Sequence, residues 1–259
     1  MADGQTGSGK TYTMVGNGDD VHGIIPRAIN QMFRTKENRE SHLSFSMQAS
    51  LFEIYNEEMR DLLAKGKPKR NGASELQETE LDSQSQAEEL IDSASTNRSV
   101  SYTAQNEQSS RSHMIFRLRV KCHNVDTGET LEGGLDLVDL AGSEKLKKSG
   151  SEGESKKEAE KIHTSLTALS RVLQSLANNE SHIPYRDSKL TQELMPSLGG
   201  QSSKTLMMVN VSSDPQSSEE TVSSLRLGER ANGAVVDSTK RKTAQHQHQQ
   251  QQSLTKRGR

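Results

Sequence analysis

A glycine-rich run near the start of the chain has the composition and spacing of a loop that binds nucleotide phosphates. Residues 4–11 read GQTGSGKT and match the pattern G-x-x-x-x-G-K-[ST]. In such a loop the backbone N–H groups surround the phosphates, the lysine (Lys10) reaches their terminal oxygens, and the hydroxyl (Thr11) holds Mg²⁺. The loop normally joins a buried strand to a helix, and residues 1–3 are too few to supply that strand. We therefore predict an ATP-type site whose preceding strand is missing.

Two later segments place possible Mg²⁺ ligands beside charged side chains. Residues 106–113 read NEQSSRSH and residues 139–144 read DLAGSE. Two such segments in this order are typical of a nucleotide switch that responds to the γ-phosphate. Taken singly, the glycines of the loop could be a flexible stretch, and Asp139 and Glu144 could be ordinary carboxylates at a strand end. The combination of all three segments favours the nucleotide site.

The three segments together resemble the kinesin motor domain, with its phosphate loop, its NxxSSRSH switch and its DLAGSE switch. A fourth segment, residues 182–191 (HIPYRDSKLT), is similar to a stretch in the microtubule-binding face of that family. The resemblance extends from Gly4 to roughly Val236. It implies an α/β P-loop NTPase fold with a mostly parallel central sheet flanked by helices and lacking its first strands. Residues 1–236 would form this partial motor domain.

The resemblance implies a role for each matching residue. The residues expected to bind the nucleotide are Gly4, Gln5, Thr6, Gly7, Ser8, Gly9, Lys10, Thr11 and Tyr12. The expected Mg²⁺ ligands are Thr11, Ser110 and, through water, Asp139.

Four residues are expected to act in catalysis. Ser110 would close on the metal when ATP is bound, and Gly142 would sense the γ-phosphate through its N–H. Arg111 and Glu144 would form an ion pair that latches the two switches and orders the attacking water, because phosphoryl transfer depends mainly on positioning and electrostatics.

The function implied is that of a microtubule-based motor ATPase, which binds ATP and Mg²⁺ and couples ATP hydrolysis to movement along microtubules or binding to them. The expected location is the cytoplasm, on the microtubule cytoskeleton, with no nucleic-acid partner and no membrane insertion. The expected contacts with tubulin are Lys145, Lys147, Lys148, Lys156, Lys157, Tyr185, Arg186 and Lys189. On base rates a lysine cluster is more often simply a solvated face, so this surface depends on the resemblance.

Two alternatives stay open at this point. The first is a non-hydrolysing pseudo-motor or fragment that only binds microtubules. The second, a GTP switch, is weaker because no [NT]KxD segment for guanine recognition is present.

Composition adds few constraints. The chain has 259 residues, with 33 basic and 35 acidic side chains, so electrostatic steering must come from local patches. Hydrophobic residues make up 30% and aromatic residues 3%, which predicts a thin core. Cys122 is the only cysteine and excludes an intramolecular disulfide. No apolar stretch is long enough to span a bilayer, and we expect a soluble, intracellular protein.

The elements that must position the site are predicted from periodicity. Helices are expected at residues 10–14, 26–33, 159–176 and 188–194, and another is expected to open with a capping box of Ser217 and Glu220. Strands are expected at residues 43–51, 116–122, 135–140 and 205–211, the second and third forming a hairpin. Residues 64–86 show no sustained period and are predicted to be a loop. The basic, glutamine-rich residues 237–259 are predicted to be a disordered tail.

Overall fold

The computed structural model describes residues 1–17, 22–39, 42–64, 76–100, 110–144, 154–200 and 202–234. Within these residues the chain forms a seven-stranded sheet in the order β3-β2-β5-β6-β1-β7, with β4 paired to β2. The strands are β1 (Ala2–Asp3), β2 (Leu43–Tyr55), β3 (Glu58–Asp61), β4 (Thr79–Glu80), β5 (His113–Asn124), β6 (Thr130–Asp139) and β7 (Met208–Val209).

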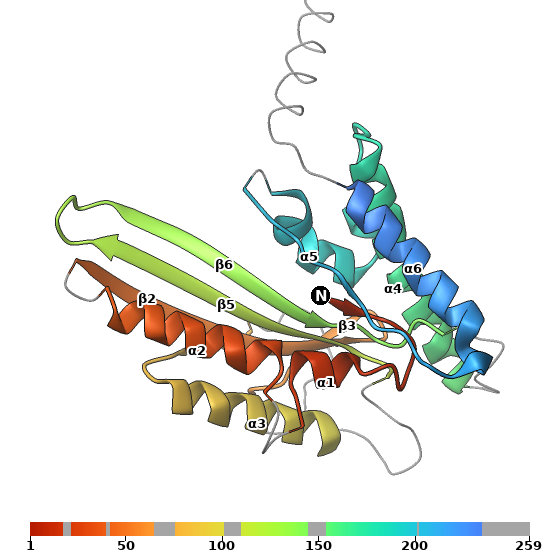
Figure 1. Ribbon diagram of the computed structural model, residues 1–259, viewed down its shortest axis with the longest axis horizontal. Coiled ribbons are helices and arrows are strands. Elements are labelled where there is room, and N and C mark those ends of the chain that lie inside the picture. Colours follow the sequence, from red (N-terminus) through yellow and green to blue (C-terminus); the bar gives the residue numbers. More distant parts are fainter. Residues whose placement is uncertain are drawn as a thin grey trace, which may run out of the picture.

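Helices cover both faces of this sheet. The helices α1 (Lys10–Met14), α2 (Ile24–Glu37) and α3 (Gln84–Val100) lie on one side, as Figure 1 shows. The other side carries α4 (Glu154–Ala177), α5 (Lys189–Gly199) and α6 (Ser218–Gly233). Two short 3₁₀ turns, Tyr185–Asp187 and Pro215–Ser217, precede α5 and α6. The predicted α/β class with flanking helices is therefore confirmed.

The strand pairing is mixed, which corrects the expectation of a mostly parallel sheet. The long strands β2, β5 and β6 pair antiparallel, and β3 and β4 also pair antiparallel with β2. The parallel pairs are those of β1 with β6 and with β7. For β5 and β6, which form the predicted hairpin, the reason is connectivity: they are joined by a tight turn near Gly128, and a short turn can join only antiparallel neighbours.

A short strand does precede the phosphate loop, contrary to our prediction. Ala2 pairs with Asp139 on one side and with Met208 on the other, so β1 lies between β6 and β7. The N–H of Leu140 donates to the carbonyl oxygen of Ala2 at 3.2 Å, and the N–H of Asn210 donates to that of Asp3 at 2.7 Å. Backbone hydrogen bonds on both sides fix the position from which the loop starts.

Apolar side chains that alternate between the two faces of the long strands form two hydrophobic cores, one on each side of the sheet. In β2, Leu51 packs with α1, α2 and α3, whereas its neighbour Phe52 packs with α4, α5 and α6. In β5, Phe116 and Ile115 divide in the same way. Successive side chains of a strand point to opposite faces, so one stretch of sequence supplies both layers. The turn end of the β5–β6 hairpin extends beyond α4, α5 and α6 (Figure 1).

Most predicted elements are confirmed, with changes at their ends. The helix α4 and the strands β2, β5 and β6 fall where periodicity placed them. The helix α5 continues through Pro196 to Gly199 instead of ending at the proline. The strand predicted at residues 205–211 is reduced to two residues.

The loop predicted at residues 64–86 is wrong in its described part, since it contains β4 and the start of α3. Residues 65–75 of that loop and the predicted tail at residues 237–259 lie outside the described residues.

The predicted capping box is also wrong. Ser217 precedes α6, but its hydroxyl makes no capping bond to that helix. Instead the hydroxyl accepts a hydrogen bond from the side-chain amide of Gln5 at 2.8 Å. The residue that we expected to start a helix therefore contacts the phosphate loop.

Candidate nucleotide site

The phosphate loop connects the end of β1 to the start of α1. Gly4, Gly7 and Gly9 all have positive φ angles, of 152°, 79° and 91°. A Cβ atom on Gly4 would lie 2.2 Å from the carbonyl oxygen of Asn210, so only glycine fits at that position. The N–H of Ser8 donates to the carbonyl oxygen of Gln5 at 3.2 Å and closes the turn.

Lys10 lies inside this loop. Its Nζ donates to the carbonyl oxygens of Gly4 and Gln5, both at 2.8 Å, and the side chain is buried. Burial lowers the pKa of Lys10, while the carboxylates of Asp139, Glu144 and Asp3 oppose that change. The site therefore concentrates a cation and three carboxylates at one end of the sheet.

Thr11 and Asp139, two of the residues expected at the Mg²⁺, contact each other. The Thr11 hydroxyl donates to Oδ2 of Asp139 at 2.7 Å. The other oxygen, Oδ1, is buried and has no hydrogen-bond partner among the described residues. A buried carboxylate oxygen without a donor is costly unless a ligand supplies one, and metal-bound water is such a donor. These residues therefore fit the Mg²⁺ that the sequence predicted.

The segment that follows β6, residues 140–144, contacts both other predicted parts of the site. We call these five residues the connector. The N–H of Gly142 donates to the carbonyl oxygen of Ser110 at 2.8 Å, and the N–H of Ser143 donates to that of Gly4 at 3.1 Å. The structure thus brings together the phosphate loop, the segment around Ser110 and the connector, as the three motifs predicted.

Glu144 contacts the phosphate loop directly. Its Oε2 accepts from the backbone N–H of Thr6 at 2.8 Å, and its Oε1 accepts from the Thr6 hydroxyl at 2.6 Å. A Cβ atom on Gly142 would lie 2.4 Å from this carboxylate, so a larger residue there would displace the Glu144 side chain. The ion pair of Glu144 with Arg111 stays a prediction.

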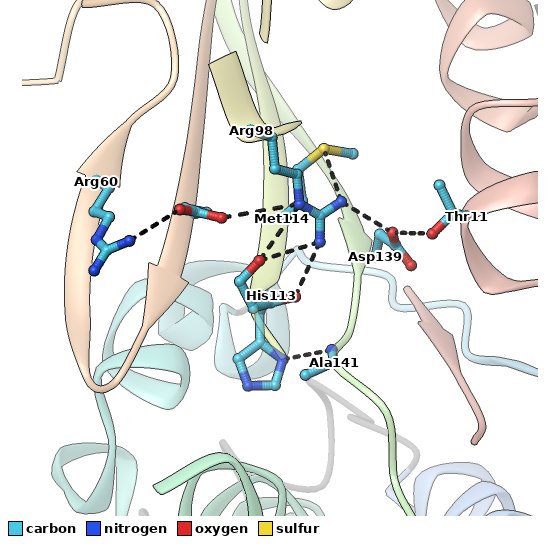
Figure 2. A network of polar contacts seen from close by, with 9 residues as sticks. Thr11, Arg60, Arg98, His113, Met114, Asp139 and Ala141 are labelled. Carbon is cyan, nitrogen blue, oxygen red and sulfur yellow. Dashed lines mark hydrogen bonds and ion pairs between the residues drawn. The ribbon is translucent and has the colours of Figure 1, made fainter. Parts of the chain in front are cut away.

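A buried charge network missed by the sequence reasoning supports Asp139. Arg98, near the end of α3, donates to the carbonyl oxygen of Ser112 at 3.1 Å and to Oδ2 of Asp139 at 3.5 Å, as Figure 2 shows. Oε2 of Glu53 lies 3.9 Å from Nε of Arg98, and Arg60 approaches Glu53 at 3.6 Å from the other side. The sequence did hold a signal, because Glu53 interrupts an apolar stretch of β2 and a buried carboxylate needs a cation.

Asp3 was also missed. It is fully buried beside the loop, and neither carboxylate oxygen makes a hydrogen bond of good geometry with a described residue. Burial raises the pKa of Asp3 to about 6, although Lys10 and, more weakly, Ser224 and the Gly4 backbone lower it. Asp3 is therefore a buried carboxylate that folding places in an unfavourable position.

The predicted tubulin contacts are placed only in part. Arg186 is exposed, whereas Tyr185 is half-buried and packs against the core cluster that contains residues of α4 and α5. The Nζ of Lys189 lies 3.4 Å from Oε1 of Glu193, one turn along α5. The predicted lysines at 145, 147 and 148 lie outside the described residues, and those at 156 and 157 fall in α4, where the structure does not describe their side chains.

These features define a phosphate-loop nucleotide site in which two further segments reach the loop, and comparison with known proteins identifies the family. The family model of the kinesin motor domain matches residues 1–234. The chain is 44% identical to the kinesin-like protein KIN-14M of Arabidopsis thaliana over 264 residues, which cover 93% of this chain and 35% of that protein. It is also 44% identical to KIN-14N of Oryza sativa subsp. japonica, covering 94% of this chain and 34% of that protein. The chain thus spans about a third of the length of these relatives.

Solved structures agree. A structure described as that of a fast kinesin is similar with a TM-score of 0.80 and 40% identity, covering 89% of this chain and 69% of that one. The motor domain of the kinesin-like protein KAR3 of Saccharomyces cerevisiae gives a TM-score of 0.76 at 38% identity, covering 90% and 73%. A KIF14 dimer structure with AMP-PNP in complex with a microtubule gives 0.79 at 35% identity, covering 90% and 70%.

This chain belongs to the kinesin motor domain family, as its motifs predicted. Among the helices that the structure describes, none has the length and apolar character needed to cross a membrane.

Proposed function

We propose that this chain binds ATP with Mg²⁺ in the loop at residues 4–11 and couples ATP hydrolysis to movement along microtubules or binding to them. One observation carries the proposal. The connector donates backbone hydrogen bonds to Gly4 in the loop and to Ser110, so the three segments form one hydrogen-bonded cluster. A change at the phosphates would therefore alter the hydrogen bonds of both the connector and the segment at Ser110.

The residues that would hold the nucleotide are those of the loop and the first turn of α1. Lys10 would bind the phosphate oxygens, and Thr11, Ser110 and a water held by Asp139 would ligate Mg²⁺. When bound, Mg²⁺ neutralises charge on the β- and γ-phosphates and stabilises the transferring phosphoryl group. The free oxygen of Asp139 supports this arrangement.

The protein's own groups must change partners when nucleotide binds. The Nζ of Lys10 now bonds two loop carbonyls and must turn outward to reach phosphate oxygens. The N–H of Gly142 has one proton, which it now gives to Ser110, so offering it to a γ-phosphate means releasing Ser110. This competition makes Gly142 a two-position sensor, and the exchange would move the segment at Ser110.

We place Glu144 and Arg111 at the attacking water. The carboxylate of Glu144 already accepts two hydrogen bonds from Thr6, and a carboxylate has acceptor sites for a guanidinium as well. The proposed pair with Arg111 would then link the connector, the phosphate loop and the segment at Ser110 in the state that hydrolyses ATP.

The proposed track-binding surface consists of Tyr185, Arg186, Lys189 and five lysines that follow the connector in sequence, Lys145, Lys147, Lys148, Lys156 and Lys157. Acidic tubulin would attract the cations of this surface, with an affinity that falls as salt rises. The proposed location is the cytoplasm, on microtubules.

The test separates a motor from a fragment that only binds the track. ATP turnover would be measured with and without microtubules, together with release of a fluorescent ADP analogue and co-sedimentation at several salt concentrations. We expect stimulated turnover and pelleting that responds to ATP. Lys10→Ala should lose nucleotide binding, while Lys36→Ala, a lysine on α2, serves as the matched control. Salt-sensitive pelleting that ignores ATP, without turnover, would favour the non-hydrolysing alternative.

A further inference from the structure

His113 joins the nucleotide side of the molecule to α4. It is the first residue of β5, and its side chain is buried in the region shown in Figure 2. The N–H of Ala141, in the connector, lies 3.0 Å from Nδ1 of His113. On the other side of the ring, Nε2 lies 2.7 Å from the hydroxyl oxygen of Ser165 in α4. One imidazole ring therefore bridges two segments of the chain, the connector and α4.

The direction of every hydrogen bond in this bridge is fixed. A backbone N–H can only donate, so Nδ1 must accept and the single ring proton must sit on Nε2. Nε2 then donates to Ser165, whose own hydroxyl proton goes to the carbonyl oxygen of Ile162 at 2.8 Å. Burial, helped by Arg98 and Lys10, lowers the pKa of His113 to about 3. The ring therefore stays neutral across the physiological pH range and keeps both bonds.

The position of the bridge gives it a functional meaning. Ala141 directly precedes Gly142, whose N–H contacts Ser110. A displacement of the connector that moves Gly142 also moves Ala141, and the ring can follow only if Ser165 follows or the bridge breaks. We propose that His113 is a positioning residue that ties the connector to α4, so that the state of the nucleotide site and the placement of α4 are linked through its two ring nitrogens. This inference deepens the proposed function and relies on it for the identity of the signal.

A purely structural histidine would fill space and satisfy two buried polar groups without transmitting anything. The two readings differ in one measurable respect. Ser165 is hydrogen-bonded to His113, and His113 is in turn hydrogen-bonded to Ala141, so the ring lies between these two residues. If the ring transmits position, then a change made at Ser165 must be detected at the backbone of Ala141. If it only fills space, the effect of that change should stay within α4.

Two substitutions divide the bridge into its halves. In His113→Asn the side-chain oxygen can take the place of Nδ1 and accept from Ala141, but it has no group that reaches Ser165. In His113→Gln the side-chain amide can take the place of Nε2 and donate to Ser165, but the acceptor for Ala141 is lost. Ser165→Ala removes the α4 end alone. Ser175→Ala, another buried serine of α4, is the matched control.

The experiment measures hydrogen exchange of the Ala141 amide by NMR, on the full chain without nucleotide or microtubules. We expect Ser165→Ala to speed this exchange by about two- to tenfold, the equivalent of weakening one hydrogen bond, while Ser175→Ala leaves it unchanged. In the His113→Asn background, Ser165→Ala should have no further effect, because the bridge is already cut. Unchanged exchange at Ala141 in Ser165→Ala, or equal effects in both backgrounds, would overturn the proposal.

Two further measurements test the bridge, the first independent of ATPase activity and the second a measure of it. The ¹⁵N shifts of His113 should show the neutral form protonated at Nε2, and the other neutral form would refute the assignment. Microtubule-stimulated kcat should fall in Ser165→Ala relative to Ser175→Ala, with KM for ATP unchanged. Equal kcat values would show that the bridge is structural only. If microtubules stimulate no variant, including the parent, the proposed function fails, and the exchange at Ala141 alone decides whether His113 links the two elements.

Discussion

Replacing Asp3 by asparagine should stabilise this protein at neutral pH. Asp3 is fully buried next to the phosphate loop, and its carboxylate makes no good hydrogen bond with a described residue. Its pKa rises from the ordinary value of 3.8 to about 6. At about 1.36 kcal/mol for each pKa unit, keeping this carboxylate ionised in the native state costs about 3 kcal/mol. Asparagine has the same shape and carries no charge.

The pH dependence follows from the same shift. Because the native pKa is raised, the contribution of Asp3 to stability is fully present below about pH 4 and is lost as the pH rises through about 6. The free energy of unfolding of Asp3→Asn should therefore match that of the parent near pH 4. The variant should exceed the parent by about 3 kcal/mol at pH 8, which for a domain of this size corresponds to roughly 6–12 °C in Tm.

The assay is urea unfolding of both proteins between pH 4 and pH 8, followed by circular dichroism. Asp92→Asn, at an exposed position of α3, is the control and should show no such divergence. If the free energies of unfolding of Asp3→Asn and the parent differ by the same amount at every pH in this range, Asp3 does not titrate in the native protein as its burial requires. The reasoning would then fail at the step that links burial to the pKa.

Three further changes test the site. Glu144→Ala removes both contacts to Thr6 and should trap nucleotide without turnover; normal microtubule-stimulated hydrolysis would refute the role of Glu144. Gly4→Ala places a Cβ atom 2.2 Å from a backbone oxygen and should lower the urea midpoint and nucleotide affinity together. Arg98→Met removes a cation shared by two buried carboxylates, which leaves Glu53 with Arg60 alone, and should destabilise the fold by about 3–5 kcal/mol, whereas Arg171→Met, which breaks an exposed pair, should cost under about 1 kcal/mol, both measured by thermal unfolding.

Elements with a strong local period could be predicted from the sequence, and those without one could not. The leucines of α4 recur at helical spacing, and the alternation in β2 and β5 is unmistakable. The helix α3 was missed although its buried apolar residues also recur at helical spacing; they are Ala87, Leu90, Ile91 and Ala94. Two of these four are alanines, and the residues around them are mostly Glu, Gln and Ser. Small side chains give a weak apolar signal even when they are fully buried.

The strand β1 shows a different limit. Two residues cannot display any periodicity, so no local pattern could have predicted it. Its conformation is fixed from outside, by β6 on one side and β7 on the other, which lie far along the chain. Pairing with distant strands overrides local preference for such short segments.

In the site, side-chain identities were predictable but backbone partners were not. Lys10, Thr11 and Asp139 could be named because few residue types bind phosphate or Mg²⁺. The contacts that assemble the site are instead made by N–H groups that every residue except proline possesses, such as that of Gly142 to Ser110. A sequence does not mark which N–H group meets which carbonyl oxygen.

The connector shows why these unmarked contacts control the site. Four successive N–H groups donate to four acceptors on two other stretches of the chain: Leu140 to Ala2, Ala141 to His113, Gly142 to Ser110 and Ser143 to Gly4. Each group has one proton, so none can take a new acceptor without leaving the present one. Neighbouring residues also cannot move independently, since planar peptide bonds join them. A phosphate that takes the N–H of Gly142 must therefore disturb the bonds at β1, β5 and the loop together, which gives the site two alternative arrangements in place of a graded response.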